Sequence, residues 1–239
     1  MVKLSADTLT EKKLAVEKAC ECVLDKIYSG EVRSLGIGSG STVCLFLKNL
    51  QENLDEKSLE MITVVTASYQ TYLKGMSLGF NVTMLPKLDS IDLTVDGADE
   101  VSLNKDLIKG GGAALTREKI LAYNSREVII VVDSSKLSSR LGVLKPVPVE
   151  VIPCALPFVL KSLKALGAAP KLREAQMKNG PIITDNGNFI VDAKFKSIPD
   201  AEQLENSINM IPGVIENGIF PGKRISKVFI GEGKRVKIL

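Results

Sequence analysis

In the first third of the chain, some segments have hydrophobic residues at helical spacing and others have short continuous runs of them. A helical spacing predicts a helix over residues 16–27, with Gly30 able to cap its end. Residues 33–50 have the pattern of a short strand, a glycine-rich turn and a second helix. Residues 61–68 have the continuous apolar character of a buried strand, and a helical pattern follows over residues 69–76.

The middle of the chain continues this alternation. Residues 91–100 form an apolar strand that ends in acids, and residues 127–136 are too hydrophobic for a sheet with one exposed face. Between them lie a glycine turn and a helical pattern over residues 113–124. The sequence therefore predicts an α/β fold, a Rossmann-like domain with a parallel sheet buried on both faces. The tail, residues 224–239, contains a strand that could return to this sheet.

A different pattern begins near residue 142. Residues 145–153 are extended and spaced by prolines, and helical patterns follow over 156–167 and 200–211. Residues 181–195 resemble a hairpin with Asn186-Gly187 at its turn, and a last strand covers 213–220. This order predicts a smaller ferredoxin-like α+β lobe. The expected domains are an α/β catalytic domain of residues 1–142 plus 224–239 and a lobe of residues 143–223.

Composition excludes several classes of protein. The chain has 239 residues, 45% hydrophobic and 25% charged, as in ordinary globular domains. The net charge of +3 comes from scattered Lys and Arg residues, so no nucleic-acid partner is expected. No apolar run is long enough to span a membrane, and the first residues lack the apolar core of a signal peptide. The four cysteines form no CxxC pair, which disfavours structural zinc and indicates a reduced, cytoplasmic protein.

The chain contains no histidine. Acid–base chemistry near neutral pH must therefore use carboxylates, lysines, cysteines or tyrosines. Four polar or glycine-rich segments follow predicted strands, at the edge of the sheet where open α/β proteins bind ligands. They are GSGST (38–42), DGADE (96–100), KGGG (109–112) and DSSK (133–136).

The GSGST segment precedes a predicted helix. Backbone N–H groups at such a helix start bind anions, and Ser39, Ser41 and Thr42 add hydroxyl groups. The match to a dinucleotide-binding fingerprint is poor, because Ser41 stands where the last glycine belongs. A purely steric role of the glycines is the alternative.

The DGADE segment places Asp96 directly after an apolar strand and Asp99 three residues later. Two nearby carboxylates suit proton transfer between hydroxyl groups. A solvated acidic turn is one alternative, and a magnesium site formed by Asp96, Asp99 and Glu100 is another.

The KGGG segment lies directly before a helical pattern that contains an acid. Three glycines let the backbone adopt conformations that other residues avoid, and they let a ligand approach closely. The following helix places Ala114, Glu118 and Leu121 on one face. Glu118 is then either a structural acid at the edge of an apolar stripe or a partly desolvated carboxylate aimed at the ligand. Lys109 and Lys136 supply positive charge for an anionic intermediate and for substrate binding.

These four segments, with their neighbouring residues, together resemble segments of a known protein family. GIGSGSTV, TVDGADEV, LIKGGGAALTREKI and VVDSSKL are similar to the signature segments of ribose-5-phosphate isomerases of the A type. The resemblance extends over nearly the whole chain, including TDNGN and IPGV in the predicted lobe. It implies interconversion of ribose 5-phosphate and ribulose 5-phosphate, in the pentose phosphate pathway, without a metal or other cofactor. One departure is GSGST where the family more often has GTGST, and Ser39 keeps the hydroxyl group.

The resemblance also implies roles for individual residues. Glu118 would be the general base, Asp96 and Asp99 would handle the sugar hydroxyls and assist ring opening, and Lys109 would stabilise the enediolate. The implied substrate-binding residues are Ser39, Gly40, Ser41, Thr42, Asp96, Gly97, Ala98, Asp99, Lys109, Gly110, Gly111, Gly112 and Lys136. An N-terminal lysine would reach the phosphate. Lys13 is the nearest match, with Lys12 and Lys18 as competitors.

Two other functional classes stay open at this stage. A coenzyme A transferase-like enzyme would use a glutamate as a covalent nucleophile, whereas a related sugar-phosphate deaminase would normally need a histidine. A non-enzymatic sugar-phosphate sensor would normally carry a DNA-binding domain. The expected partners are a small phosphosugar and further copies of the chain, as a homodimer or a dimer of dimers.

Overall fold

The computed structural model describes residues 6–84 and 90–239 and divides into two compact units. The first unit contains the chain up to Gly97, residues 117–136 and residues 224–239, and the second contains residues 98–116 and 137–223. The predicted domains placed residues 98–116 and 137–142 with the first unit. The structure groups them with the second because their short strands pair with one another there.

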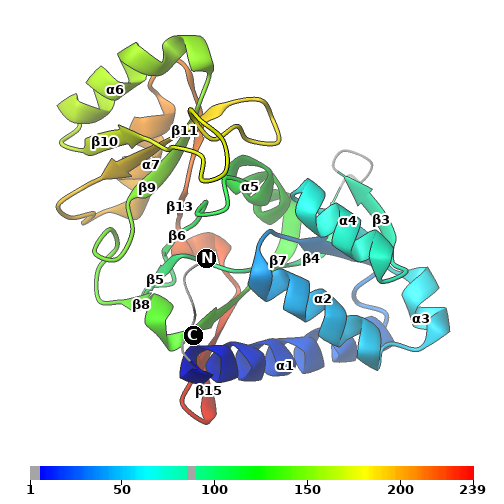
Figure 1. Ribbon diagram of the computed structural model, residues 1–239. Helices are drawn as coiled ribbons and strands as arrows, with labels where there is room; N and C mark the ends of the chain where they lie inside the picture. Colours follow the sequence, from blue (N-terminus) through cyan, green and yellow to red (C-terminus); the bar gives the residue numbers. More distant parts are fainter. Residues whose placement is uncertain (1–5, 85–89) are drawn as a thin grey trace. The chain divides into compact units, whose positions relative to one another are not determined.

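A seven-stranded sheet forms the centre of the first unit, in the order β15-β14-β7-β4-β1-β2-β3 (Figure 1). All neighbours are parallel except β15, which runs antiparallel to β14. The strands are β1 (Ser34–Ile37), β2 (Thr63–Thr66), β3 (Asn81–Met84), β4 (Ile91–Asp96), β7 (Ser125–Asp133), β14 (Lys227–Glu232) and β15 (Arg235–Ile238). The predicted parallel sheet and the returning C-terminal strand are confirmed.

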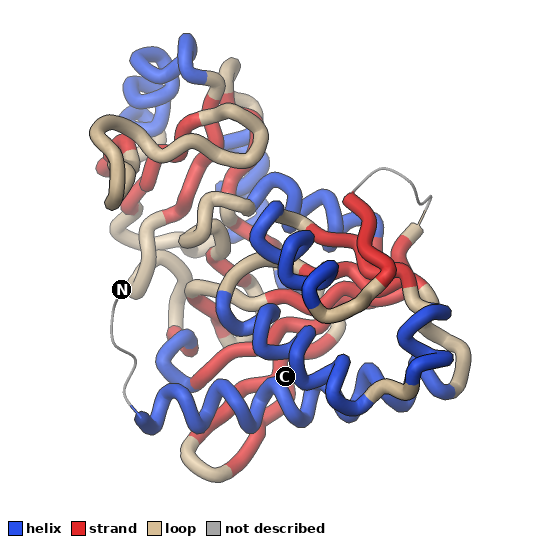
Figure 2. Tube along the Cα trace, turned by 45° about the vertical axis from the view of Figure 1, so that its right-hand side comes forward, coloured by secondary structure: helices blue, strands red, loops and turns tan. Residues whose placement is uncertain are grey.

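The helices of this unit are α1 (Ala6–Tyr28), α2 (Ser41–Asn53), α3 (Glu56–Met61), α4 (Tyr69–Ser77), α5 (Leu115–Asn124), which starts in the second unit, and the 3-10 turn η1 (Ser134–Lys136). Helices α1 and α2 pack on one face of the sheet, where α1 lies along the strands (Figure 2). On the other face, Leu121 of α5 packs against Val65 and Ile91. The sheet is therefore buried on both sides, which explains why its strands are almost continuously apolar.

The core between α1, α2 and the sheet contains Cys20. Burial raises the pKa of the Cys20 thiol to about 12. All four cysteines are free. The predicted end of α1 is also confirmed, because Gly30 has a φ of 82° and donates its N–H to the carbonyl of Ile27.

The second unit contains an antiparallel sheet in the order β10-β11-β9-β12. Its elements are β9 (Val147–Val151), η2 (Pro153–Ala155), α6 (Leu156–Ala165), β10 (Ala169–Leu172), β11 (Phe189–Lys194), α7 (Ala201–Asn209) and β12 (Val214–Asn217). This is the predicted ferredoxin-like order of strand, helix, two strands, helix and strand. The turn at Asn186-Gly187 is present, with Gly187 at a φ of 82°. The hairpin's first arm is not a strand, because residues 181 and 183 form isolated bridges only.

A third, small sheet joins β13, β6, β5 and β8 in this order. These strands are β5 (Glu100–Ser102), β6 (Leu107–Ile108), β8 (Leu137–Ser138) and β13 (Ile219–Phe220), and the turn η3 (Gly222–Arg224) follows. The single strand predicted over residues 213–220 is thus divided between two sheets at Gly218. A Cβ atom at Gly218 would lie 2.1 Å from the carbonyl oxygen of Lys109, so only glycine allows this crossing.

Within residues 6–84 and 90–239, no helix combines the length and the apolar character that a membrane crossing requires.

Candidate functional site

The carboxyl ends of β1 and β4 lie side by side at the point where the strand order of the first sheet reverses. Open α/β sheets bind ligands at this position. The carboxylate of Asp96, at the end of β4, occupies the space beside Gly38, since a Cβ atom there would lie 1.9 Å from Asp96 Cγ. The backbone N–H of Gly97 donates to Asp96 Oδ1 at 2.7 Å, and that of Ser39 lies at 3.4 Å. The main chain therefore fixes this buried acid.

The GSGST loop leads directly into α2. Gly40 has a φ of 102°, in the left-handed region, and its N–H donates to Gln70 Oε1 at 3.0 Å. The Ser39 hydroxyl donates to Ser68 Oγ at 3.1 Å. Ser41 and Thr42 form the first turn of α2, where backbone N–H groups have no carbonyl one turn earlier. The predicted strand–turn–helix is confirmed, and its geometry suits an anion.

A lysine from α1 reaches this loop. Lys12 is buried, and its ammonium group donates to Ser41 Oγ at 3.2 Å. Burial lowers the pKa of Lys12, the charge of Asp133 opposes this effect, and the nearby positive charge of Lys136 adds to it. Lys13, the nearest match in the sequence, is exposed, and Lys18 pairs with Glu21 at 2.6 Å. The structure therefore favours Lys12 as the N-terminal cation of the site.

Glu118 lies in the first turn of α5 and is 4% exposed. The neighbouring residues of its face, Ala114 and Leu121, are also buried. The adjacent Arg117 instead stacks on Tyr69, with 5.2 Å from its guanidinium carbon to the ring centroid. Burial agrees with the predicted desolvation of this carboxylate, and its role as a base stays a prediction.

In the second unit, the three glycines after Lys109 have three different environments. Gly110 has a φ of 103°, and a Cβ atom would lie 2.8 Å from Leu115 Cδ2. At Gly111 a Cβ atom would lie 2.7 Å from Asp99 Oδ1, and the Gly111 N–H donates to Asp99 Oδ2 at 2.7 Å. Gly112 has open space around it. The turn therefore needs glycine at 110 for conformation and at 111 for the approach of Asp99.

Lys109 directly follows β6, and Asp99 is hydrogen-bonded to the last residue of that strand. The Lys109 N–H donates to the carbonyl of Gly218 at 2.8 Å, and the Asp99 N–H donates to the carbonyl of Ile108 at 2.9 Å. Lys109 is buried, and its ammonium group lies 5.5 Å from the centroid of the Phe220 ring. A desolvated cation beside a carboxylate-bearing turn can stabilise negative charge that develops on a ligand.

Glu100 has a structural environment. Its carboxylate is fully buried and accepts the backbone N–H groups of Val143, Leu144 and Lys145 at 3.1, 3.1 and 2.8 Å. A carboxylate that holds three N–H groups of a loop is poorly available to a metal ion. The open alternative of a magnesium site with Glu100 as a ligand is therefore disfavoured.

The predicted residues thus divide between the units. The first unit holds Ser39, Gly40, Ser41, Thr42, Asp96, Gly97, Glu118 and Lys136, and the second holds Ala98, Asp99, Lys109, Gly110, Gly111 and Gly112. The structure adds three polar residues of the second unit: one binds the KGGG segment, one orients that residue, and one binds the start of α5. These are Arg173, Asp192 and Glu150, none of which belongs to a motif.

The fully buried carboxylate of Glu150 illustrates how these residues act. It accepts the Thr184 hydroxyl at 2.8 Å and the side-chain amides of Asn186 and Asn188 at 3.0 and 2.9 Å. It also accepts the hydroxyl of Thr116, in the first turn of α5. Glu150 therefore ties the TDNGN turn to the helix that carries Glu118. The TDNGN segment was the only sequence signal for this connection.

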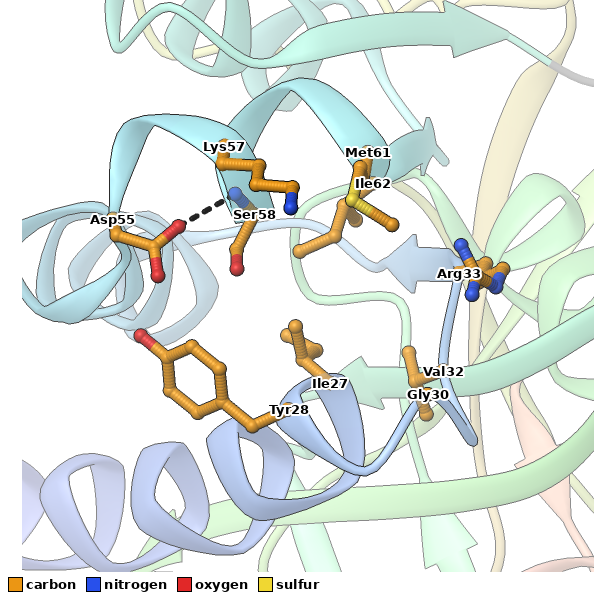
Figure 3. Close-up of a pocket in the computed structure, with 10 residues that line it drawn as sticks. All are labelled: Ile27, Tyr28, Gly30, Val32, Arg33, Asp55, Lys57, Ser58, Met61 and Ile62. Atoms are coloured by element: carbon orange, nitrogen blue, oxygen red, sulfur yellow. Dashed lines mark hydrogen bonds between the residues drawn. The ribbon is translucent and has the colours of Figure 1, made fainter.

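A cavity of about 310 Å³ lies elsewhere in the first unit (Figure 3). It is lined by Ile27, Tyr28, Gly30, Val32, Arg33, Asp55, Lys57, Ser58, Met61 and Ile62. Arg33 and Ile62 directly precede β1 and β2, so the cavity lies where these strands begin. The GSGST loop follows the other end of β1. This cavity contains none of the predicted site residues.

Comparisons with known proteins agree with the motifs. Residues 63–235 match the model of the family described as Ribose 5-phosphate isomerase A (phosphoriboisomerase A). The chain is 44% identical over 217 residues to ribose-5-phosphate isomerase A of Thermosynechococcus vestitus, covering 91% of this chain and 90% of that protein. It is also 44% identical over 223 residues to that of Archaeoglobus fulgidus, with 92% and 96% covered.

Solved structures agree as well. Ribose 5-phosphate isomerase A from Methanocaldococcus jannaschii superimposes with a TM-score of 0.88 at 39% identity, covering 97% of this chain and 99% of that one. A D-ribose-5-phosphate isomerase in complex with phospho-erythronic acid gives a TM-score of 0.90 at 42% identity, with 97% and 98% covered. On the strength of its sequence and its fold, this chain belongs to the ribose 5-phosphate isomerase A family.

Proposed function

We propose that this chain interconverts D-ribose 5-phosphate and D-ribulose 5-phosphate through a cis-enediolate. The observation that carries the proposal is its membership of the family, and the motif segments that contain Asp96, Asp99, Lys109 and Glu118 support it. The related isomerase that binds phospho-erythronic acid supports it, because this ligand joins a phosphate to a carboxylate, whose negative charge resembles that of an enediolate.

The reaction moves one proton between two adjacent carbons. Glu118 takes the proton from C2 of the open-chain aldose, and the electron pair shifts so that O1 of the aldehyde gains negative charge. The O2 hydroxyl then loses its proton and O1 gains one, so that the negative charge moves to O2, and the proton on Glu118 returns to C1 as O2 becomes the ketone oxygen. The burial of Glu118 supports this role, because it excludes water from the carboxylate that would accept the proton.

The other proposed residues stabilise or exchange charge at the oxygens. Lys109 offers a buried positive charge to the negatively charged enediolate. The chain has no histidine that could provide this charge instead. Asp96 and Asp99 handle the protons of the sugar hydroxyls and assist ring opening. Backbone N–H groups of Gly97 and Gly111 orient these two acids.

The phosphate is assigned to the start of α2. Ser39, Gly40, Ser41 and Thr42 contribute hydroxyl and backbone N–H donors, and Lys12 and Lys136 contribute charge. The contact of Lys12 with Ser41 supports its place in this group. Binding energy from the phosphate, which is remote from the reacting carbons, then helps to hold the sugar for proton transfer.

The substitution Glu118→Gln tests the proposal, because an amide of the same shape cannot accept the proton. Loss of a general base typically costs roughly 10²- to 10⁴-fold, so kcat should fall by about this factor while KM changes little. In deuterated water the native protein should exchange label into the sugar, and Glu118→Gln should not. Glu118→Asp should be intermediate, since its reach is shorter.

Near-normal turnover of Glu118→Gln would reassign the base to Asp96 or Asp99. Turnover of an acyl-coenzyme A, with a covalent adduct on a glutamate, would instead support the transferase alternative. Binding of ribose 5-phosphate without any turnover by the native chain would support the sensor alternative.

Assembly and location belong to the same proposal. We expect a homodimer or a dimer of dimers in the cytoplasm, with a role in the pentose phosphate pathway. The ferredoxin-like sheet and its helices offer surfaces for association. Light scattering at several concentrations would test the assembly.

A further inference from the structure

The glycine turn after Lys109 is held from two directions. The Arg173 guanidinium donates through Nη1 to the carbonyl oxygens of Gly110 and Gly111, at 2.8 and 3.1 Å. The Gly111 N–H lies on the opposite side of its peptide unit from the Gly110 carbonyl, and it donates to Asp99 Oδ2 at 2.7 Å. A charged side chain directly after β10 thus completes the support of a turn that belongs to the proposed site.

The turn needs such support because its own backbone does not select one conformation. Three successive glycines have many accessible conformations when they are unrestrained. The turn closes with a 3.0 Å bond from the Ala113 N–H to the Gly110 carbonyl, and Ala113 then has a φ of 61°. A left-handed conformation costs a residue with a side chain roughly 1–2 kcal/mol. Contacts outside the turn must offset this cost.

Arg173 is itself oriented by a carboxylate. Its Nε and Nη2 atoms donate to the two oxygens of Asp192 at 2.8 and 2.5 Å. Asp192 pairs with Lys171 across β10 and β11, so Arg173, two residues further on, is its diagonal neighbour on the same face. The Arg173 side chain is 16% exposed. Two nitrogens are used by Asp192, and the third reaches the turn.

This arrangement requires the fork of an arginine. A lysine carries a single ammonium group on a flexible chain and cannot bond both oxygens of Asp192 and both carbonyls of the turn in this geometry. A pair that only joined β10 to β11 would need no contact with the turn. The two carbonyl contacts therefore indicate a role beyond the stability of the sheet.

We propose that Arg173 is a positioning residue of the isomerisation, which acts through the carbonyls of Gly110 and Gly111 to hold the turn beside Lys109. The inference rests on the proposed function of that turn. Asp192 acts one step further away, because it holds the guanidinium in the orientation that the turn requires. Neither residue is assigned a contact with the substrate.

The test compares Arg173→Lys with Arg126→Lys. Arg126 also pairs with an aspartate, Asp92 at 3.5 Å, but its side chain is 71% exposed and it lies at the opposite end of β7 from the DSSK segment. A displacement of about 1 Å in a catalytic group can cost about 10²-fold, so Arg173→Lys should lower kcat by roughly 10- to 100-fold. KM should change little, since the proposed phosphate contacts are untouched. Asp192→Asn should lower kcat less, and Arg126→Lys should not change it.

A second readout does not depend on activity. Amide hydrogen exchange at Gly111, Gly112 and Ala113 should be faster in Arg173→Lys than in the native protein, while exchange in β9 and β11 stays the same. Unchanged kcat together with unchanged exchange would overturn the inference. So would a loss of thermal stability with normal kcat in the folded fraction, which is the result expected of a purely structural pair. If exchange at the turn is faster in Arg173→Lys but the native protein does not isomerise the two sugar phosphates, the proposed function is refuted. The support of the turn by Arg173 is then still upheld.

Discussion

Replacing Gly38 by alanine should disable the site through one atom. The new Cβ would lie 1.9 Å from Asp96 Cγ and from Asp96 Oδ1. Contacts below 3.0 Å essentially do not occur for Cβ atoms, so the carboxylate must move by at least about 1.1 Å, the difference between 3.0 and 1.9 Å. A displacement of about 1 Å in a catalytic group costs about 10²-fold, and kcat of Gly38→Ala should fall by at least this factor.

The cause can be separated from general damage. Gly38 does not have a positive φ, so alanine brings no backbone strain there, and its effect should come from the clash. Gly167→Ala is the matched control, because Gly167 has a φ of 88° with open space around it, follows α6 and belongs to none of the motifs. It should lose roughly 1–2 kcal/mol of stability and keep its kcat. Interconversion of the two sugar phosphates, followed by NMR, and thermal unfolding measure both quantities.

A double-mutant cycle gives the decisive comparison. In Asp96→Ala the carboxylate is absent, so adding Gly38→Ala should cause little further loss of kcat. If the two losses instead multiply, Gly38→Ala does not act through Asp96. Near-normal kcat of the single substitution Gly38→Ala would refute the reasoning at its first step.

Three other outcomes follow from the structure. Lys136→Ala should raise KM more than it lowers kcat, because its assigned contact with the phosphate is the same in ground and transition states; equal KM values of the native protein for ribose and ribose 5-phosphate would contradict this. Dialysis against EDTA should leave activity intact, because Lys109 supplies the positive charge and Glu100 is occupied by three N–H groups; recovery of lost activity with magnesium would contradict it. In the folded protein at pH 8, a thiol reagent should modify exposed Cys154 and spare Cys20, whose pKa burial raises to about 12; mass spectrometry would show a failure as early labelling of Cys20.

The elements that position the first half of the site could be predicted from sequence for a local reason. The strand before GSGST, the turn and the helix α2 follow one another within 20 residues, and each has its own periodicity and glycine signal. The rule that ligands gather where strands end then places Asp96 beside this loop. The ferredoxin-like order was predicted in the same way, from helices and strands with clear patterns.

What failed to follow from sequence depends on contacts between distant segments. Strand β10 has the sequence APKL, which carries no strand signal, yet it pairs with β11 in place of residues 181–184. Strand β6 contains two residues and exists because β5 and β13 flank it. Arg173 lies 62 residues from Gly111, and no motif connects them. Tertiary pairing decides such elements, and single-chain patterns do not record it.

The choice among the three lysines shows the same limit at a single site. Lys12 and Lys13 are adjacent, and the resemblance to the family gave Lys13 as the nearest match. The helix decides between them because adjacent residues point about 100° apart, and only Lys12 belongs to the buried stripe with Ala15, Val16 and Ala19. A charged residue at a position of the apolar stripe was therefore the available signal. It distinguishes a cation that must be desolvated from one that faces water.

Two glycines of this chain leave the space that two of its acidic side chains occupy. Asp96 lies where a side chain of Gly38 would be, and Asp99 lies where a side chain of Gly111 would be. In each unit, one carboxylate of DGADE is thus paired with one glycine of a glycine-rich turn, and a backbone N–H of the main chain holds it. A glycine run is costly because it adds conformational freedom to the unfolded chain. Here the cost is offset because the missing side chains leave room for two acids to approach the backbone, where a chain without histidine needs them.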